Sequence, residues 1–500
     1  MMRRFLMLCW ASSCLGWYVP APGQEVAGSD AQDVFQAAWS ISGAECYEHV
    51  AKLAGEEMAG RATGSAEFLA AARYIAEQFR SMGLQSPEAF DSFLQRFFLD
   101  RNIIEPGSEF ALEVPIKGKK GYDTLWVPYQ LESDFLPFGP SQSGEVIAET
   151  VFIGYGLSSP ENKWDDYRGK DLRNKTVVVL TGTPNLENAS WGDLGRLRYK
   201  YGFAEKAGAA AFIGIGGPYA TIHSDVSLPS VLISEKVAND LLKGTGYTLQ
   251  KMIQEINTKK TGIMVPTRFR TRLKVQNRLE KNCETANIVA LLRGSDPVLK
   301  DEYLVLGAHA DHLGALDRLV FYGANDNGSG TAVLLEVAQA FSLLKTPPRR
   351  SIIFIAFTGE EMGLLGAKHF VDHPMVDLKN VKAMINMDMV GSGRKGIMVV
   401  CGKVFPEFAA RFEKTNQQPM QIPILTGGMS RNSDHYPFYE KGIPSVFLFT
   451  MGGVSTWHST RDRAETLDSE VMEMAGRQVF RVLYELANQE HIHFPELEAN

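Results

Sequence analysis

Cysteine and a surplus of either charge are what this sequence most clearly lacks. Only five of the 500 residues are cysteine, and none forms a Cys-x-x-Cys pair, which excludes a thiolate zinc site and a disulfide framework. The 51 basic and 58 acidic side chains give a net charge of −7, and such a chain offers no electrostatic surface for nucleic acid. A composition of 45% hydrophobic and 22% charged residues is that of an ordinary globular protein.

Long apolar runs are scarce as well. The one at the N-terminus, residues 5–19, follows two arginines and is shorter than the ~20 residues that span a bilayer. A small-residue cleavage pattern, Ala-Pro-Gly, follows it at residues 21–23. We therefore interpret residues 1–23 as a signal peptide, which predicts a secreted or periplasmic protein with no membrane segment in its mature form. Lipid attachment at Cys14 is the minor alternative. Removal of this segment leaves Cys46, Cys283 and Cys401, which can form at most one disulfide.

The rest of the sequence changes character twice. Residues 24–40 are small and polar and predict a loose lead-in. Helical spacing follows, with a stripe that ends at Gly83 and contains Phe68, Ala72, Ile75, Ala76 and Phe79. From about residue 136 to residue 265, short strands broken by turn residues predict a β-rich insertion. We expect it to interrupt a domain made of residues 41–135 and 266–490.

Apolar strands alternate with amphipathic helices after the insertion. The strands include "YLVLGAH", "SIIFIAFTG", "KAMINMDM" and "SVFLFT", and one of the helices carries Val333, Val337, Ala340 and Phe341 on a single side. Strands that are apolar on both faces and alternate with helices are typical of buried parallel sheets. The sequence therefore predicts an α/β fold with a mixed, mostly parallel sheet covered by helices on both faces.

Charged and imidazole side chains follow the predicted carboxyl ends of these strands. One further acid stands in the loop "GANDNGSG" just before a helix. Because ligands of open α/β sheets gather beyond the carboxyl ends of the strands, we expect these side chains to converge at one edge. The set is His309, Asp311, Asp326, Glu360, Glu361, Asp388 and His458.

Nitrogen and oxygen ligands without a thiolate suit zinc, cobalt or manganese. The chemistry that fits this set is a pair of divalent metals that share a bridging carboxylate, hold a water and polarise a carbonyl. A carboxylate that is not a ligand must then take the proton of the water. Glu360 and Glu361 are adjacent and point differently, so they can divide the two roles.

These motifs together resemble the co-catalytic two-zinc aminopeptidases, on the fold called phosphorylase/hydrolase-like. The segments are His309-x-Asp311, "GANDNGSG", "TGEEMGLLG", "MINMDMVG" and "HSTRD". The nearest likeness is to the secreted bacterial branch, because "FIGYGLSSPENKWDDYRGKDLRNKTVVVL" resembles its inserted protease-associated domain. The resemblance implies two Zn²⁺ per chain and peptide substrates. It also implies an insertion that stands beside the metals and screens out large folded substrates.

The resemblance also assigns a role to each site residue. Asp326 bridges both metals, His309 and Asp388 complete one site, and Glu361 and His458 complete the other. Asp311 orients His309, as carboxylates commonly do for histidine ligands. Glu360 is the general base. The family often has a tyrosine just before the "SDH" segment, and this sequence has none there, so the group that stabilises the oxyanion stays open.

Two other activities share this ligand order. A glutaminyl cyclase uses a related fold with one zinc but lacks an insertion. A glutamate-directed carboxypeptidase needs a cation for the substrate carboxylate, for which Arg431 is the one obvious residue near the "SDH" segment. The acids of the site outnumber the metal charges slightly, which favours a substrate ammonium and hence an aminopeptidase. We expect His312 at the surface or rim, and Asp434 and His435 as a hydrogen-bonded loop pair.

Overall fold

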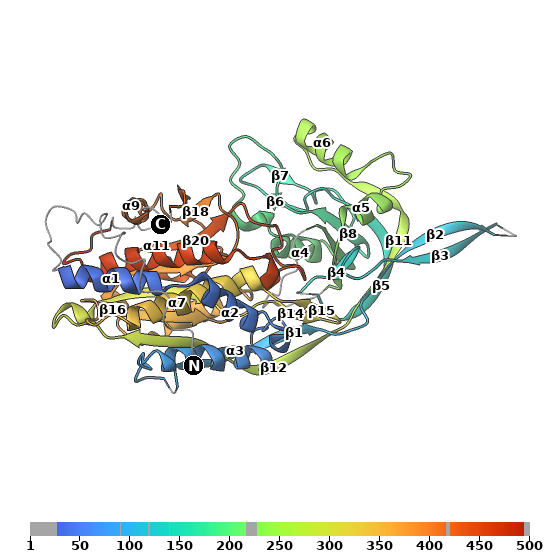
Figure 1. Ribbon diagram of the computed structural model, residues 1–500. Coiled ribbons are helices and arrows are strands. Elements are labelled where there is room, and N and C mark those ends of the chain that lie inside the picture. Colours follow the sequence, from blue (N-terminus) through green and yellow to red (C-terminus); the bar gives the residue numbers. More distant parts are fainter. Residues whose placement is uncertain are drawn as a thin grey trace.

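The computed structural model describes residues 28–90, 92–118, 121–139, 141–216, 228–416 and 421–494. The expected signal peptide, residues 1–23, lies outside these residues. Within them, no helix is both long and apolar enough to cross a membrane. The chain forms two separate sheets of eight strands each, which lie at opposite ends of an elongated molecule (Figure 1).

The first sheet has the mixed topology that the sequence predicts. Its order is β1 (Leu94–Ile104), β12 (Asn277–Leu292), β16 (Ser351–Phe357), β13 (Tyr303–His309), β17 (Val381–Met387), β20 (Ser445–Met451), β18 (Gly396–Val400) and β19 (Ile424–Thr426). The four central strands β16, β13, β17 and β20 are parallel. The flanking pairs β1–β12, β12–β16 and β18–β20 are antiparallel. The carboxyl ends of the central strands therefore meet at one edge, as expected.

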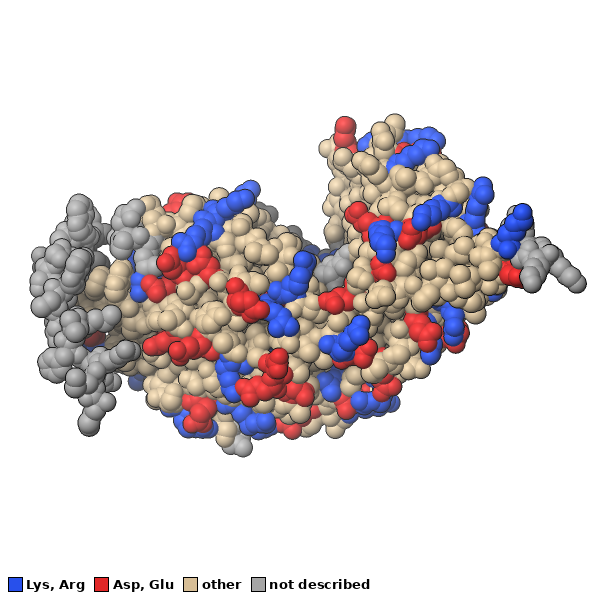
Figure 2. Space-filling view, turned by 45° about the vertical axis from the view of Figure 1, so that its right-hand side comes forward, with Lys and Arg blue, Asp and Glu red and all other residues tan. Residues whose placement is uncertain are grey.

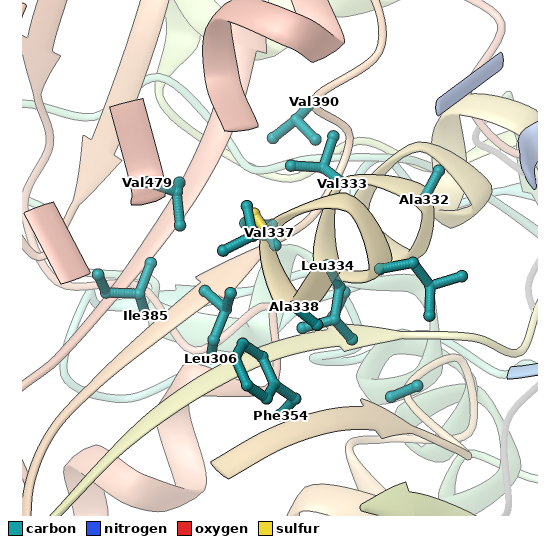
Figure 3. Close-up of a cluster of buried hydrophobic side chains, with 14 of the residues drawn as sticks. Leu306, Ala332, Val333, Leu334, Val337, Ala338, Phe354, Ile385, Val390 and Val479 are labelled. Atoms are coloured by element: carbon teal, nitrogen blue, oxygen red, sulfur yellow. The ribbon is translucent and has the colours of Figure 1, made fainter. Parts of the chain in front are cut away.

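Helices cover both faces of this sheet. One face carries α2 (Gly43–Leu53), α3 (Ala66–Ser81), α7 (Gly330–Ser342) and α11 (Ser469–Asn488), and the other carries α8 (Leu365–Asp372) and α10 (His435–Glu440). Figure 3 shows how Val333, Val337 and Ala338 of α7 pack against Leu306 and Phe354 of the central strands. The helices of the first face thus form one continuous core with the sheet. A further helix, α9 (Pro406–Thr415), packs near β19.

The amphipathic helix predicted before residue 83 is α3, and its whole predicted stripe is buried. Ser65 caps its N-terminus by accepting a hydrogen bond from the amide of Phe68 (3.0 Å), and Gly83 follows it with a φ of +74°. The expected loose lead-in before residue 40 is wrong, because α1 (Gly28–Ser40) is a helix. Its small residues Ala37 and Ala38 are buried in the core of the first sheet, a contact that a polar composition conceals.

The second sheet combines strands with helices. Its order is β3 (Gly121–Pro128), β2 (Glu109–Gly118), β11 (Val265–Val275), β5 (Gly144–Phe152), β8 (Thr176–Leu180), β9 (Ala211–Ile215), β10 (Ser230–Ile233) and β4 (Phe135–Pro137). The strands β5, β8, β9 and β10 are parallel. The helices of this region are α4 (Leu197–Lys206), α5 (Glu235–Leu241) and α6 (Leu249–Lys259). We call this sheet with its helices the second unit.

The chain enters and leaves the second unit at one place. β1 continues into β2 after a short turn, and β11 continues into β12 across Gln276 alone. The two crossings are joined, since the amide of Glu105 donates to the carbonyl of Gln276 (2.8 Å). The second sheet thus takes in β2, β3 and β11, and it extends beyond the interval 136–265 at both ends. β1 and β2 both mix apolar and charged residues, so composition does not mark the crossing.

Candidate metal centre

The seven predicted site residues come together at the carboxyl edge of the first sheet. His309 ends β13, Asp388 directly follows β17, and Glu360 and Glu361 stand a few residues beyond β16. Asp326 lies just before α7, and His458 lies in the loop after β20. His309 and His458, which are 149 positions apart in the chain, therefore lie at the same edge of the sheet, because parallel strands end there.

Asp326 stands between the two histidines. His309 Nε2 lies 3.3 Å from Asp326 Oδ1 and 3.4 Å from Asp388 Oδ1. On the other side, His458 Nε2 lies 3.1 Å from Asp326 Oδ2 and 3.1 Å from Glu361 Oε2. Each oxygen of Asp326 thus faces a different histidine and a different second carboxylate, which is the geometry of a carboxylate shared by two ions.

This donor set fits two divalent metal ions. One ligand atom each of His309, Asp326 and Asp388 lies within 4.8 Å of the others, and the same holds for His312, Asp326 and Glu361. All these side chains are buried, and buried carboxylates require a compensating charge. Imidazole and carboxylate donors without sulfur match zinc, cobalt or manganese. Asp326 belongs to both groups, whereas the predicted ligand His458 belongs to neither and His312 stands in the second group.

The electrostatics of the site divide its acids into two kinds. Burial opposes the charged form of Asp326, yet hydrogen bonds with His309 and His458 hold its pKa well below the usual range. Glu361 behaves alike, because His458 lowers its pKa against the effect of burial. The pKa of Glu360, in contrast, is raised well above its usual value by burial and by the neighbouring acids Glu361 and Asp388. The pKa values of the two adjacent glutamates are therefore shifted in opposite directions.

Each carboxylate oxygen of Asp311 accepts a hydrogen bond. Its Oδ2 accepts a hydrogen bond from the hydroxyl of Thr63 (2.7 Å), and its Oδ1 accepts one from the amide of Glu360 (3.2 Å). Its carboxylate is 3.8 Å from Nδ1 of His309, while its own carbonyl oxygen lies closer to that nitrogen, at 3.2 Å. The carboxylate of Asp311 is thus hydrogen-bonded to the segment that carries Glu360, and its orientation of His309 stays a prediction.

The structure adds residues that the sequence did not single out. Asp462, the last letter of "HSTRD", accepts hydrogen bonds from the amides of Asn325 (2.9 Å) and Asp326 (3.0 Å). The hydroxyl of Ser433 donates to Asp388 Oδ2 (2.8 Å). Asp462 and Ser433 each lie more than 40 residues along the chain from the residue that they contact. The only signal for them in the sequence is that each stands inside a motif, as an acid or a hydroxyl.

Two expectations for neighbouring residues are wrong. His312 is 1% exposed, and its Nδ1 lies 2.7 Å from Glu361 Oε1, because the chain turns inward after Asp311. His435 pairs with the carbonyl of Ser430 (3.0 Å) rather than with Asp434. Among the described residues, neither carboxylate oxygen of the buried Asp434 has a hydrogen-bond partner. Burial raises the pKa of Asp434 well above its usual value, and the acids Asp311 and Asp388 raise it further.

Cys46, Cys283 and Cys401 are buried and unpaired with one another. None of the three stands in the metal-ligand groups found among the described residues. The absence of a thiolate from the site agrees with the ligand types that the sequence predicts.

Comparisons with known proteins agree with this architecture. Residues 287–483 match the model of peptidase family M28. Aminopeptidase YwaD of Bacillus subtilis (strain 168) is 35% identical over 178 residues, which are 34% of this chain and 38% of that protein. The matches to this and the next curated relatives cover between 34% and 57% of the relatives' length.

Solved structures show the same fold over most of the chain. An aminopeptidase from Aneurinibacillus sp. strain AM-1 has a TM-score of 0.65 at 21% identity, covering 93% of this chain and 98% of that one. A zinc aminopeptidase from Bacillus subtilis has a TM-score of 0.61 at 22% identity, covering 90% and 96%. All seven predicted site residues lie within the segment that matches the family model. The match to peptidase family M28 and the similarity to these solved structures thus cover the same segment that carries the site residues.

Proposed function

We propose that the protein is a secreted dinuclear zinc aminopeptidase that removes N-terminal residues from peptides. The observation that carries the proposal is the position of Asp326, with one oxygen toward His309 and Asp388 and the other toward His458 and Glu361. The family of residues 287–483 and the aminopeptidase relatives support the same reaction class. Export rests on the signal-like segment at residues 1–23.

His309, Asp326, Asp388, Glu361 and His458 hold the two ions in this proposal. When bound, the ions polarise the scissile carbonyl and lower the pKa of the attacking water. His312 offers a further nitrogen ligand beside Glu361, because its Nδ1 lies 2.7 Å from Glu361 Oε1.

Glu360 takes the proton of the attacking water in this scheme. Its pKa is raised while that of Glu361 is lowered, so Glu360 is the stronger proton acceptor of the two. Asp311 holds the amide of Glu360 in place. The same carboxyl then returns the proton to the leaving amine, which completes hydrolysis.

The direction of cleavage follows from the charge around the site. The acids of the predicted set slightly outnumber the charges of two metal ions, so the surroundings favour a substrate ammonium over a carboxylate. Arg431, the residue that a carboxypeptidase would need, is exposed, and its guanidinium lies 5.4 Å from the ring centre of Tyr436. We also assign the second unit to the protease-associated type, beside the entrance to the site. A recess separates this lobe from the body of the molecule (Figure 2).

Three versions of one peptide test the proposal after chelation and resupply of zinc. The versions are free at both ends, acetylated at the amino end, or amidated at the carboxyl end, and products are identified by mass spectrometry. We expect the free and amidated peptides to lose their first residue and the acetylated peptide to stay intact. Cleavage of the last residue, blocked by amidation, would establish a carboxypeptidase with Arg431 as the carboxylate ligand. Cyclisation of an N-terminal glutamine would establish the cyclase.

A further inference from the structure

A small hairpin joins the two halves of the metal-ligand loop. It consists of β14 (Gly314–Leu316) and β15 (Leu319–Phe321), and it lies between His309 and Asp326 in the chain. In space it lies between the first sheet and the second unit (Figure 1). Strands of three residues do not form a stable hairpin by themselves, so neighbouring structure must hold this one in place.

The residues that flank the hairpin and those within it pack into different hydrophobic cores. Ala308 and Ala310 before it, and Tyr322 and Ala324 after it, belong to the hydrophobic core of the first sheet. Four of the apolar residues between them belong instead to the core of the second unit, with members such as Phe110 and Phe152, while Val320 packs against the core of the first sheet. These four are Leu313, Leu316, Leu319 and Phe321. The chain thus leaves one core after one metal-ligand residue and returns just before the next.

Arg61, which lies just before α3, holds the base of the hairpin. This fully buried guanidinium donates to the carbonyls of Ala310 (2.8 Å), Tyr322 (2.6 Å) and Gly323 (2.6 Å), which lie on both sides of the hairpin. The neighbouring Gly60 passes so close that a Cβ there would lie 2.3 Å from the carbonyl oxygen of Phe321. The base is therefore fixed by polar contacts, and the tip depends on apolar contacts with the second unit.

A second ligand loop also contacts the second unit. Thr460 lies two residues after His458, and Glu132 lies just before β4 of the second unit. The hydroxyl of Thr460 donates a hydrogen bond to the carboxylate of Glu132. The loops that carry His309, Asp326 and His458 are thus all in contact, directly or through the hairpin, with the second unit.

We propose that the second unit is a structural part of the metal centre, and that Leu316 and its hairpin neighbours are positioning residues for the ligands on either side. This inference rests on the ligand set of the proposed function. Loss of apolar contact at the hairpin tip lets the loop between His309 and Asp326 move, which widens the spacing of the ligand atoms. Metal affinity then falls although no ligand has been changed.

The experiment compares two leucines of the same core in the full-length chain. Leu316→Ala removes a side chain that is 1% exposed in the hairpin, and Leu241→Ala removes one that is 0% exposed in α5, away from the ligand loop. Zinc affinity is measured by competition with a chelating indicator, and folding by circular dichroism and thermal unfolding. Leu319→Ala, at an 8% exposed position, serves as the milder hairpin variant if Leu316→Ala does not fold.

We expect the hairpin variant to bind zinc on the order of 10-fold more weakly than wild type, in the range seen when groups that support metal ligands are changed. The Leu241→Ala protein, with a comparable loss of thermal stability, should keep the affinity of wild type. Equal zinc affinity in wild type and hairpin variants, or an equal loss in both variants, would overturn the inference. A wild-type protein that binds no zinc would instead overturn the proposed function.

Discussion

Glu360→Gln separates the proposed general base from the proposed ligands. The substitution keeps the shape of the side chain and removes its ability to take a proton. The amide of Glu360, which donates to Asp311, is part of the backbone and is retained. Glutamine has nearly the same shape and volume as glutamate, so the substitution should be tolerated without loss of stability.

The expected loss lies in the rate alone. Removal of a general base lowers kcat on the order of 10²–10⁴-fold, which corresponds to about 3–5 kcal/mol in the activation free energy. Zinc content should equal that of wild type, because the proposal gives Glu360 the role of base and not of ligand. Glu361→Gln is the matched control, because it removes an oxygen that lies 3.1 Å from His458 Nε2. That variant should lose zinc as well as activity.

The assay pairs kcat with zinc content measured by mass spectrometry of metals in the dialysed protein. Loss of zinc in Glu360→Gln with retention in Glu361→Gln would show that the two roles are exchanged. A Glu360→Gln protein with the kcat of wild type would show that Glu360 is not the general base.

Three further outcomes are expected. Chelation should lower the Tm, because Asp326 and its neighbours lose the cations that offset their charge, and zinc should restore it in proportion to its concentration. Asp462→Asn keeps only one carbonyl-type oxygen for the amides of Asn325 and Asp326, so zinc affinity should fall while far-ultraviolet circular dichroism stays unchanged. Burial raises the pKa of Glu336 from 4.5 to about 7, so its contribution to stability is present below about pH 4.5 and is lost as pH rises to about 7. Glu336→Gln should therefore raise the Tm at pH 8 relative to wild type, and the difference should shrink at pH 5.

Local patterns predict the first sheet and the positions of its ligand residues well. The strands "SIIFIAFTG" and "KAMINMDM" end at Phe357 and Met387 in the structure, since each apolar run stops where polar residues begin. Parallel pairing then brings their ends together without further information. The ligand residues follow these ends, so their approach needs no knowledge of distant contacts.

Features that depend on distant contacts escape local patterns. Helix α1 carries few large apolar residues, and it forms because Ala37 and Ala38 fit against a core made by other helices. His312 differs from a surface histidine only in the inward turn of its loop. Asp462 contacts an amide 136 residues earlier in the chain, and no spacing rule connects the two.

The hairpin between His309 and Asp326 bears on what the second unit does. A unit that only screens substrates would touch the rest of the molecule at its own boundaries, at the crossings near Glu105 and Gln276. Here it also buries Leu316 and Phe321, which lie inside the metal-binding segment of the other unit. Deletion of residues 105–276 would therefore expose those side chains and leave the hairpin without its apolar partners. If this packing retains the metals, as we propose, point substitutions at the hairpin separate metal retention from the expected substrate screening more cleanly than deletion does.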